Sequence, residues 1–178
     1  MTVLQTEPLA LPAAMEPDNP LWRYALACWQ NPELAETCLD LQAQDWSVTR
    51  ILCAGWLGVN GREFTGVEDA KVTEWRARVT GSIRSARKSI PRHHNACHDL
   101  REALASAELQ AEKNELALAW QTLTSRNPET GKMLDRKTAT LQNLLAAAPL
   151  RDAETEATEP LKTLAILLAE AIERDPTP

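Results

Sequence analysis

The sequence has little glycine and, apart from tryptophan, few aromatic residues. It contains six glycines, one phenylalanine and one tyrosine, against six tryptophans. A chain poor in glycine and rich in Ala, Leu, Glu and Gln favours helices over sheets, and no alternating pattern is long enough for a strand. No apolar run approaches the ~18 residues that a membrane-spanning helix needs. We therefore expect neither a β-rich fold nor a membrane protein.

The four cysteines lack CxxC spacing, which excludes the usual pattern of a zinc ribbon or a redox pair. Cys28, Cys38 and Cys53 each fall on the apolar face of an expected helix. Buried free thiols of this kind are typical of proteins in a reducing cytosol. Residues 1–20 have no basic segment, and prolines interrupt their short apolar run, so we expect no secretory signal. These features predict a cytoplasmic protein.

Helix start and stop residues divide the rest of the chain. Asn19-Pro20 and Asn31-Pro32 each place an N-cap residue before a proline at the first helical position. They predict helices over 20–30 and 32–44. Further helices are expected from Ser47 to about residue 57, from beyond Gly66 to Pro91, over 93–124, near 133–147 and near 158–173.

The predicted fold is therefore all-α, a single compact helical bundle of about five to seven helices. Residues 1–18 contain prolines and no sustained periodicity, which predicts a flexible N-terminal arm. Residues 19–147 are expected to form the helical domain. Residues 148–178 are expected to form an acidic linker followed by a C-terminal helix.

Positive charge is concentrated in one segment of this acidic chain. The formal net charge is −6, yet residues 75–98 contain no Asp or Glu. A helical projection of the segment gives a narrow apolar stripe. The stripe consists of Val72, Trp75, Val79, Ile83, Ala86 and Ile90. The basic residues on the opposite or flanking sides are Arg76, Arg78, Arg84, Arg87 and Lys88, followed by Arg92. We expect one buried side and one cationic side.

Three interpretations of this cationic side remain open. It is a solvated surface with internal ion pairs to neighbours such as Glu68, Asp69 and Glu74, a docking surface for an acidic protein, or a contact for nucleic-acid phosphate. No stacking aromatic residues accompany the arginines, which disfavours nucleic acid. The leading hypothesis is a non-catalytic adaptor or accessory protein that docks an acidic macromolecule, protein rather than nucleic acid. The docking residues would be Arg76, Arg84, Arg87, Lys88 and Arg92.

The tryptophans support an alternative hypothesis. Trp22, Trp29 and Trp56 follow the apolar stripes of their helices, which favours a role in the core. The alternative is a helical bundle with a Trp-lined cavity that binds a small molecule or acts as an enzyme. Trp46, next to the capping residue Ser47, is the tryptophan that we expect to face a pocket or a partner.

The three histidines form the one cluster with metal-ligating chemistry. His94 and His98 would share a helix face, with Cys97 within reach. Three ligands are fewer than the four of a closed structural zinc site, so we predict no metal site and no cofactor. We predict no catalytic residue, because no nucleophile and base occur in a recognisable arrangement. The chain is therefore more typical of a non-catalytic protein than of an enzyme.

Three short motifs give the chain a family resemblance. They are Leu21-Trp22-Arg23-Tyr24-Ala25-Leu26, Cys38-Leu39-Asp40-Leu41-Gln42 and Trp56-Leu57-Gly58. Over about residues 20–120 the sequence resembles an uncharacterised family of small proteobacterial proteins, classed as a domain of unknown function. The resemblance implies a helical fold and a bacterial cytoplasmic protein. It implies no activity.

Overall fold

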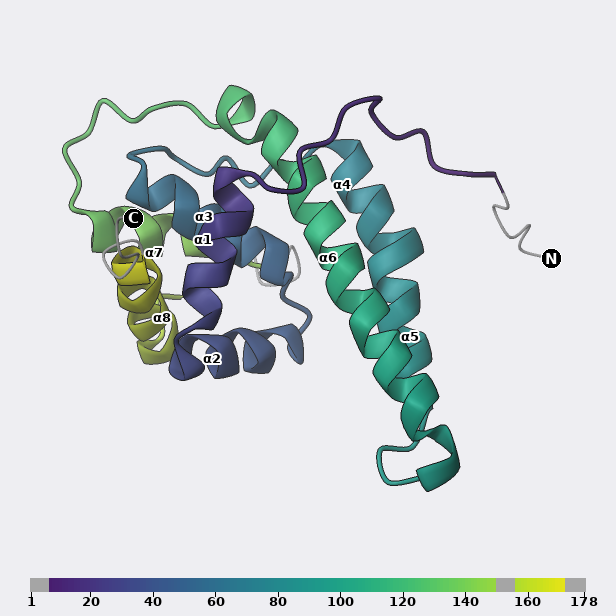
Figure 1. The fold of residues 1–178 in the computed structure, drawn as a ribbon. Coiled ribbons are helices and arrows are strands. Elements are labelled where there is room, and N and C mark those ends of the chain that lie inside the picture. The colour runs from purple at the N-terminus through teal and green to yellow at the C-terminus, as the bar shows by residue number, and fades with distance from the viewer. Residues whose placement is uncertain (1–6, 150–155, 172–178) are drawn as a thin grey trace, which may run out of the picture.

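The computed structural model describes residues 7–149 and 156–171. This part of the chain contains no strand. Its α-helices are α1 (Pro20–Trp29), α2 (Pro32–Gln42), α3 (Val48–Val59), α4 (Ala70–Trp75), α5 (Gly81–Ser89), α6 (His98–Arg126), α7 (Arg136–Ala147) and α8 (Glu159–Glu170) (Figure 1). A π-helical turn, Arg76–Thr80, joins α4 to α5 without a break. Counted with α4–α5 as one, the described residues form seven helices, which confirms the all-α prediction.

The helix boundaries follow the predicted caps closely, with one exception. The Asn19 side chain accepts a hydrogen bond from Trp22 N at 2.9 Å, and Ser47 Oγ accepts one from Arg50 N at 3.3 Å. The long helix α6, however, begins at His98 rather than at residue 93. A 3₁₀ turn at Asn95–Cys97 precedes it, because the chain reverses direction after Pro91.

Helix α3 lies in the centre of a body formed by α1, α2, α3, α7 and α8 (Figure 1). Two glycines allow its neighbours to approach closely. A Cβ at Gly58 would lie 2.7 Å from Thr140 Cα on α7, and a Cβ at Gly55 would collide with the Tyr24 hydroxyl. That hydroxyl donates a hydrogen bond of 2.8 Å to Leu168 O and so links α1 to α8.

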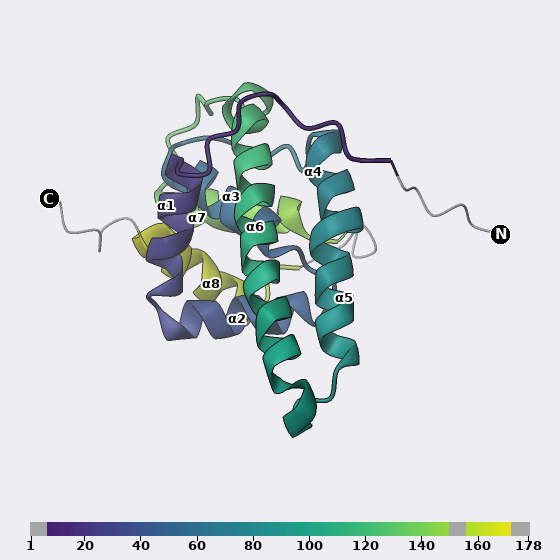
Figure 2. The same cartoon turned by 45° about the vertical axis from the view of Figure 1, so that its right-hand side comes forward.

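Helices α4–α5 and α6 form a long antiparallel hairpin that projects from the body (Figures 1 and 2). The predicted apolar stripe does not form the packing surface of α5. Val72 on α4 is buried, but Ile83 and Ile90 are half-buried and Ala86 is exposed. Charged side chains form much of the contact between α5 and α6 instead, as described below.

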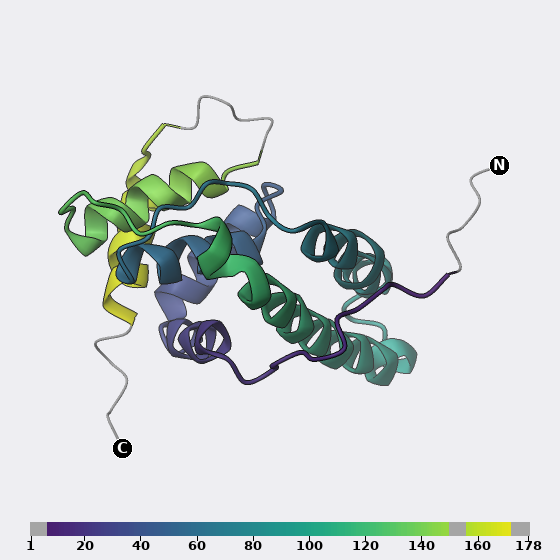
Figure 3. The same cartoon turned by 90° about the horizontal axis from the view of Figure 1, so that it is seen from above.

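Residues 7–18 form no helix and run from α1 across α6 toward α4 (Figure 3). Gln121 Nε2 on α6 donates to Ala14 O at 2.6 Å, and Arg78 donates to Glu7 O at 2.5 Å. Part of the predicted arm (1–6), part of the predicted acidic linker (150–155) and the end of the chain (172–178) lie outside the described residues. Helix α8 packs against α7 and α3.

The cysteine prediction is confirmed. Cys28, Cys38 and Cys53 are buried free thiols. Burial raises the pKa of Cys28 and of Cys38 to about 12, and it raises the pKa of Cys53 as well. These thiols stay protonated at neutral pH and belong to the core. Among the described helices, none is long and apolar enough to cross a membrane.

Candidate ligand-binding cavity

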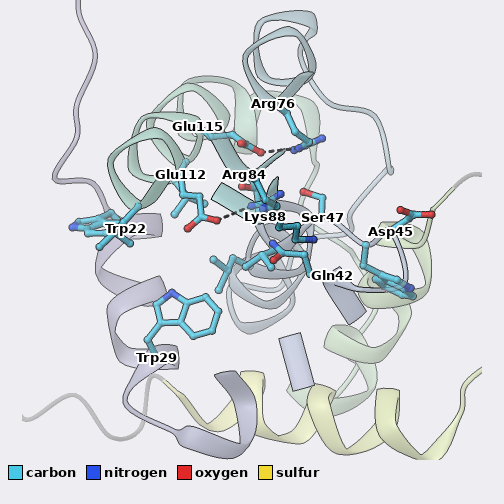
Figure 4. A pocket seen from close by; sticks show the side chains of 16 residues that line it. Trp22, Trp29, Gln42, Asp45, Ser47, Arg76, Arg84, Lys88, Glu112 and Glu115 are labelled. Carbon is cyan, nitrogen blue, oxygen red and sulfur yellow. Dashed lines mark hydrogen bonds and ion pairs between the residues drawn. The ribbon is translucent and has the colours of Figure 1, made fainter. Parts of the chain in front are cut away.

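A cavity of about 260 Å³, open to solvent, lies between the body and the α4–α6 hairpin (Figure 4). Side chains reach it from α1, from the end of α2, from the α2–α3 connection, from α3, from α5 with the preceding π-helical turn, and from α6. Each of these elements brings a different chemistry. The apolar wall comes mainly from α1 and α3, and the charged wall comes from the hairpin.

Three tryptophans line the cavity. Trp22 and Trp29 are seven residues apart, so both lie on the same side of α1 (Figure 4). Trp46 comes from the α2–α3 connection, where Asp45 adopts a left-handed backbone (φ 69°) and Trp46 N donates to Leu41 O at 3.1 Å. The sequence singled out Trp46 as the tryptophan expected to face a pocket or a partner; it lines this cavity, although it is only 6% exposed and also belongs to the hydrophobic core.

Trp22 and Trp29, which were predicted for the core, both pack against the core and line the cavity. Trp56 and Trp120 form a separate edge-to-face pair with ring centroids 5.1 Å apart. Neither of these two lines the cavity.

The π-helical turn places the first charged group, Arg76. Its guanidinium donates to both carboxylate oxygens of Glu68, at 2.7 and 2.9 Å, and to Glu115 Oε1 on α6 at 2.7 Å. Thr80 Oγ1, at the end of the same turn, donates to Glu115 Oε2 at 2.8 Å. Arg50 on α3 adds a further contact to Glu68 at 3.0 Å. Arg76 is therefore fixed in direction at the cavity wall.

A second group of ion pairs follows about two turns further along the hairpin, since Arg84 comes eight residues after Arg76. Arg84 donates to Glu108 Oε1 at 2.7 Å and to Glu112 Oε1 at 2.8 Å. Arg87 donates to the other oxygen of Glu108 at 2.5 Å. Glu108 thus accepts from two arginines, whereas Glu112 accepts from one.

Of the three interpretations of the cationic side, internal ion pairing describes Arg76, Arg84 and Arg87, with partners mainly on α6. A π-helical turn adds a residue to the helix and rotates the residues that follow by about 100°. Arg84 and Arg87, which follow the turn, consequently point at α6 instead of away from it. Of the internal partners considered, Glu68 pairs with Arg76, Glu74 pairs with Arg78, and Asp69 pairs with Arg126 instead.

The sequence reasoning missed the carboxylates of α6. Glu108, Glu112 and Glu115 are spaced by four and three residues, so they form one acidic stripe along the helix. Arg84 and Arg87 show the matching three-residue spacing. These two spacings in the sequence could have predicted that the arginines of α5 pair with the glutamates of α6 in an antiparallel hairpin.

Lys88 and Arg92 are exposed, and neither makes an ion pair with another residue in 7–149 or 156–171. The two differ in position. Lys88 lines the cavity together with Gln42 and Ser47 (Figure 4), whereas Arg92 does not line it and lies in the turn after α5. Lys88 is therefore a cation at the cavity whose charge no described carboxylate neutralises.

Adjacent carboxylates on α6 have pKa shifts of opposite sign. Burial raises the pKa of Glu112, and the negative charges of Glu108 and Glu115 add to the rise, which the Arg84 contact only partly offsets. Burial also acts on Glu108, but hydrogen bonds from Arg87 and Arg84 outweigh it and hold the pKa below its usual value. Hydrogen bonds from Arg76 and Arg50 lower the pKa of Glu68 against burial in the same way.

The histidine cluster does not assemble a metal site in the described part of the chain, where no group of three or more His, Cys, Asp or Glu side chains could hold an ion. His94 precedes the 3₁₀ turn and His98 is the first residue of α6. The shared helix face on which the candidate set His94, Cys97 and His98 depended is therefore not formed.

One protein-family model matches the chain. Its description is "Protein of unknown function (DUF2390)", and the match covers residues 20–119. This range contains every residue that lines the cavity, whereas α7 and α8 lie outside it. No curated protein and no solved structure matches the chain significantly.

Proposed function

We propose that this chain, which belongs to the DUF2390 family of proteins of unknown function, binds a small organic molecule. The ligand would occupy the cavity between the body and the hairpin. The observation that carries the proposal is the composition of the cavity wall. It combines three tryptophans with three cationic side chains, two from α5 and one from the preceding π-helical turn. Small-molecule sites typically join a large apolar surface to a few polar groups.

The size of the cavity fits a compact ligand. Small-molecule sites usually enclose about 300–1,000 Å³, and this one encloses about 260 Å³. A molecule of one or two rings suits this volume better than a nucleotide or a lipid does. Tryptophan surfaces suit flat or apolar groups.

The charged wall is held in place before any ligand arrives. Arg76 and Arg84 each contact two carboxylates, and their side chains are 23% and 20% exposed. Groups fixed in this way lose little conformational entropy on binding. Because these arginines and glutamates already neutralise each other, the arrangement supports binding rather than catalysis.

The same ion pairs weigh against docking of an acidic macromolecule. Of the five residues assigned to that role, Arg76, Arg84 and Arg87 are engaged inside the hairpin. Only Lys88 and Arg92 remain exposed, and two cations form a small docking surface. We therefore favour the cavity over the basic helix as the functional site.

We propose the bacterial cytoplasm as the location. The support is chemical: Cys28, Cys38 and Cys53 are free thiols in the core, and such thiols persist in reducing compartments.

A ligand screen tests the proposed function. Because three tryptophans line the cavity, a bound compound should change tryptophan emission in a saturable way and should raise the melting temperature by a few degrees at saturating concentration. Trp29→Phe should weaken binding of any hit. Trp120→Phe, which changes a tryptophan away from the cavity, is the matched control. A broad set of one- and two-ring metabolites that yields no saturable hit would contradict the proposal.

A further inference from the structure

We propose that the cavity selects a monoanion: a flat, one- or two-ring molecule with a single carboxylate that pairs with the Lys88 ammonium. This inference rests on the proposed function and adds the chemical class of the ligand. It follows from the ion pairs around the cavity and from the place of Lys88, the cavity-lining cation that makes no ion pair with a described residue.

The wall charges of the hairpin cancel. Arg76 lies between Glu68 and Glu115, and Arg84 lies between Glu108 and Glu112. With Arg50 and Arg87, these residues make four cations and four carboxylates joined by contacts of 2.5–3.0 Å. A ligand therefore meets no net charge from this network.

Lys88 is the exception. It lines the cavity from the last turn of α5, it is exposed, and it makes no ion pair with any described residue. Its exposure places the ammonium at the rim, where a ligand carboxylate can reach it while the rest of the molecule enters the cavity. Gln42 and Ser47 also line the cavity and offer an amide N–H and a hydroxyl as further donors to such a carboxylate.

A single negative charge suits the site better than two. Lys88 supplies one positive charge, whereas Glu112, Glu115 and Asp45 present carboxylates to the same space. Burial, together with the charges of Glu108 and Glu115, also raises the pKa of Glu112, so this part of the wall adds no attraction for a second negative charge. A phosphate monoester, which carries close to two charges at pH 7, would be repelled more strongly than a carboxylate.

The apolar body of the ligand has its own contact surface. Trp22 and Trp29 lie along the α1 side of the cavity (Figure 4). The other apolar residues that line it are Trp46, Val48, Leu52, Leu109 and Leu116. Flat rings stack on indole faces or meet them edge-on, which adds to the gain from apolar burial. An aromatic carboxylate satisfies both this surface and Lys88.

A matched set of probes tests the inference on the full-length protein by titration calorimetry. The probes are 2-naphthoate, 2-naphthamide, 2-naphthyl phosphate and 2-naphthylmethylamine, which share one ring system and differ in charge. We expect 2-naphthoate to bind at least about tenfold more tightly than each of the others. We also expect its affinity to fall as salt is raised from 20 to 300 mM, because the rim contact is screened.

Lys88 variants identify the partner of the carboxylate. Lys88→Met keeps the length of the side chain but removes its charge, and it should weaken 2-naphthoate binding about tenfold while leaving 2-naphthamide binding unchanged. Lys88→Arg should restore the affinity to within about threefold. Lys71→Met, on the exposed side of α4 and away from the cavity, is the control and should bind like the wild type.

The outcomes separate the two proposals. If the four probes bind equally, or if the amine or the phosphate binds best, the cavity binds ligands but the monoanion inference is wrong. An unchanged 2-naphthoate affinity in Lys88→Met would also overturn it. If no probe binds and the metabolite screen gives no hit, the proposed function itself fails.

Discussion

Glu108 and Glu112 lie one turn apart on α6, yet their carboxylates stand in opposite electrostatic surroundings. Glu108 accepts hydrogen bonds from two arginines, and its pKa is lowered. Glu112 accepts from one arginine and lies near two other carboxylates, and its pKa is raised. The folded protein therefore favours the charged form of the first residue and disfavours the charged form of the second.

Isosteric amides at these two positions should consequently behave differently. Glu108→Gln leaves Arg84 and Arg87 with a neutral partner, and we expect it to lower the free energy of unfolding at pH 7 by about 2 kcal/mol. This is less than the ~3–5 kcal/mol typical of a fully buried ion pair, because both arginines are partly exposed. Glu112→Gln should change stability by less than about 1 kcal/mol. Urea denaturation measures both, and equal losses in the two variants would contradict this account.

Among the helices, the π-helical turn Arg76–Thr80 has the largest effect on the site. It directs Arg76 and Thr80 toward Glu115, a carboxylate that is only 3% exposed. A buried carboxylate needs its donors, since removal of one leaves part of the desolvation cost uncompensated. The turn and the glutamate thus stabilise each other.

Thr80→Val tests this dependence, because valine keeps the shape of threonine without its hydroxyl. We expect the variant to be destabilised by about 1–3 kcal/mol. Thr73→Val makes the same exchange at an exposed position of α4 and should cost less than about 0.5 kcal/mol. Thermal unfolding followed by circular dichroism distinguishes the two, and a Thr80→Val variant as stable as its control would disprove the dependence.

The contact of α3 with α7 gives a second prediction for the packing of elements. A methyl group at Gly58 would meet the backbone of Thr140, which cannot move without shifting α7. Gly58→Ala should therefore lower the free energy of unfolding by about 1–3 kcal/mol. Gly131→Ala, at a position with no atom within 4 Å of the added carbon, is the control. Denaturant unfolding of the two variants measures the difference, and a stable Gly58→Ala protein would show that α7 shifts easily.

The sequence predicted where helices begin better than it predicted which side of each helix packs against a neighbour. Asn19, Asn31 and Ser47 marked the starts of three helices because capping is a local interaction. The orientation of Arg84 could not be obtained by the same reasoning. It depends on a π-helical turn that is accompanied by a hydrogen bond from Thr80 to Glu115, two residues 35 positions apart. The tryptophans were assigned correctly to apolar faces, because helical periodicity is a local property of the sequence. The charged half of the cavity was missed, because it depends on contacts between residues far apart in the sequence.

For the whole molecule, the shifted carboxylates predict how stability depends on pH. Glu68 and Glu108 have folded-state pKa values below the ordinary 4.5. Their contribution is present above pH 4.5 and is lost as the pH falls through the lower, folded-state values. Glu112 has a raised pKa, so the folded state binds its proton more tightly than the unfolded state does. Its effect is a gain in stability as the pH falls from neutrality toward 4.5.

We therefore expect the melting temperature to rise slightly as the pH is lowered from 7 to 5. Below about pH 4.5 the melting temperature should fall steeply. Melting curves from pH 3 to pH 8 measure this profile. In Glu112→Gln the rise should disappear while the acid loss remains. If the variant keeps the rise, another group is responsible for it.

The cavity has walls from two parts of the molecule, the body and the projecting hairpin. A bound ligand would contact both parts and would consequently restrict the motion of the hairpin relative to the body. The backbone amides of α5, most of which lie outside the cavity, would then exchange with deuterium more slowly when it is filled. Ligand binding would therefore be detected as slower hydrogen exchange along α5, although the ligand contacts this helix only through the side chains of Arg84 and Lys88.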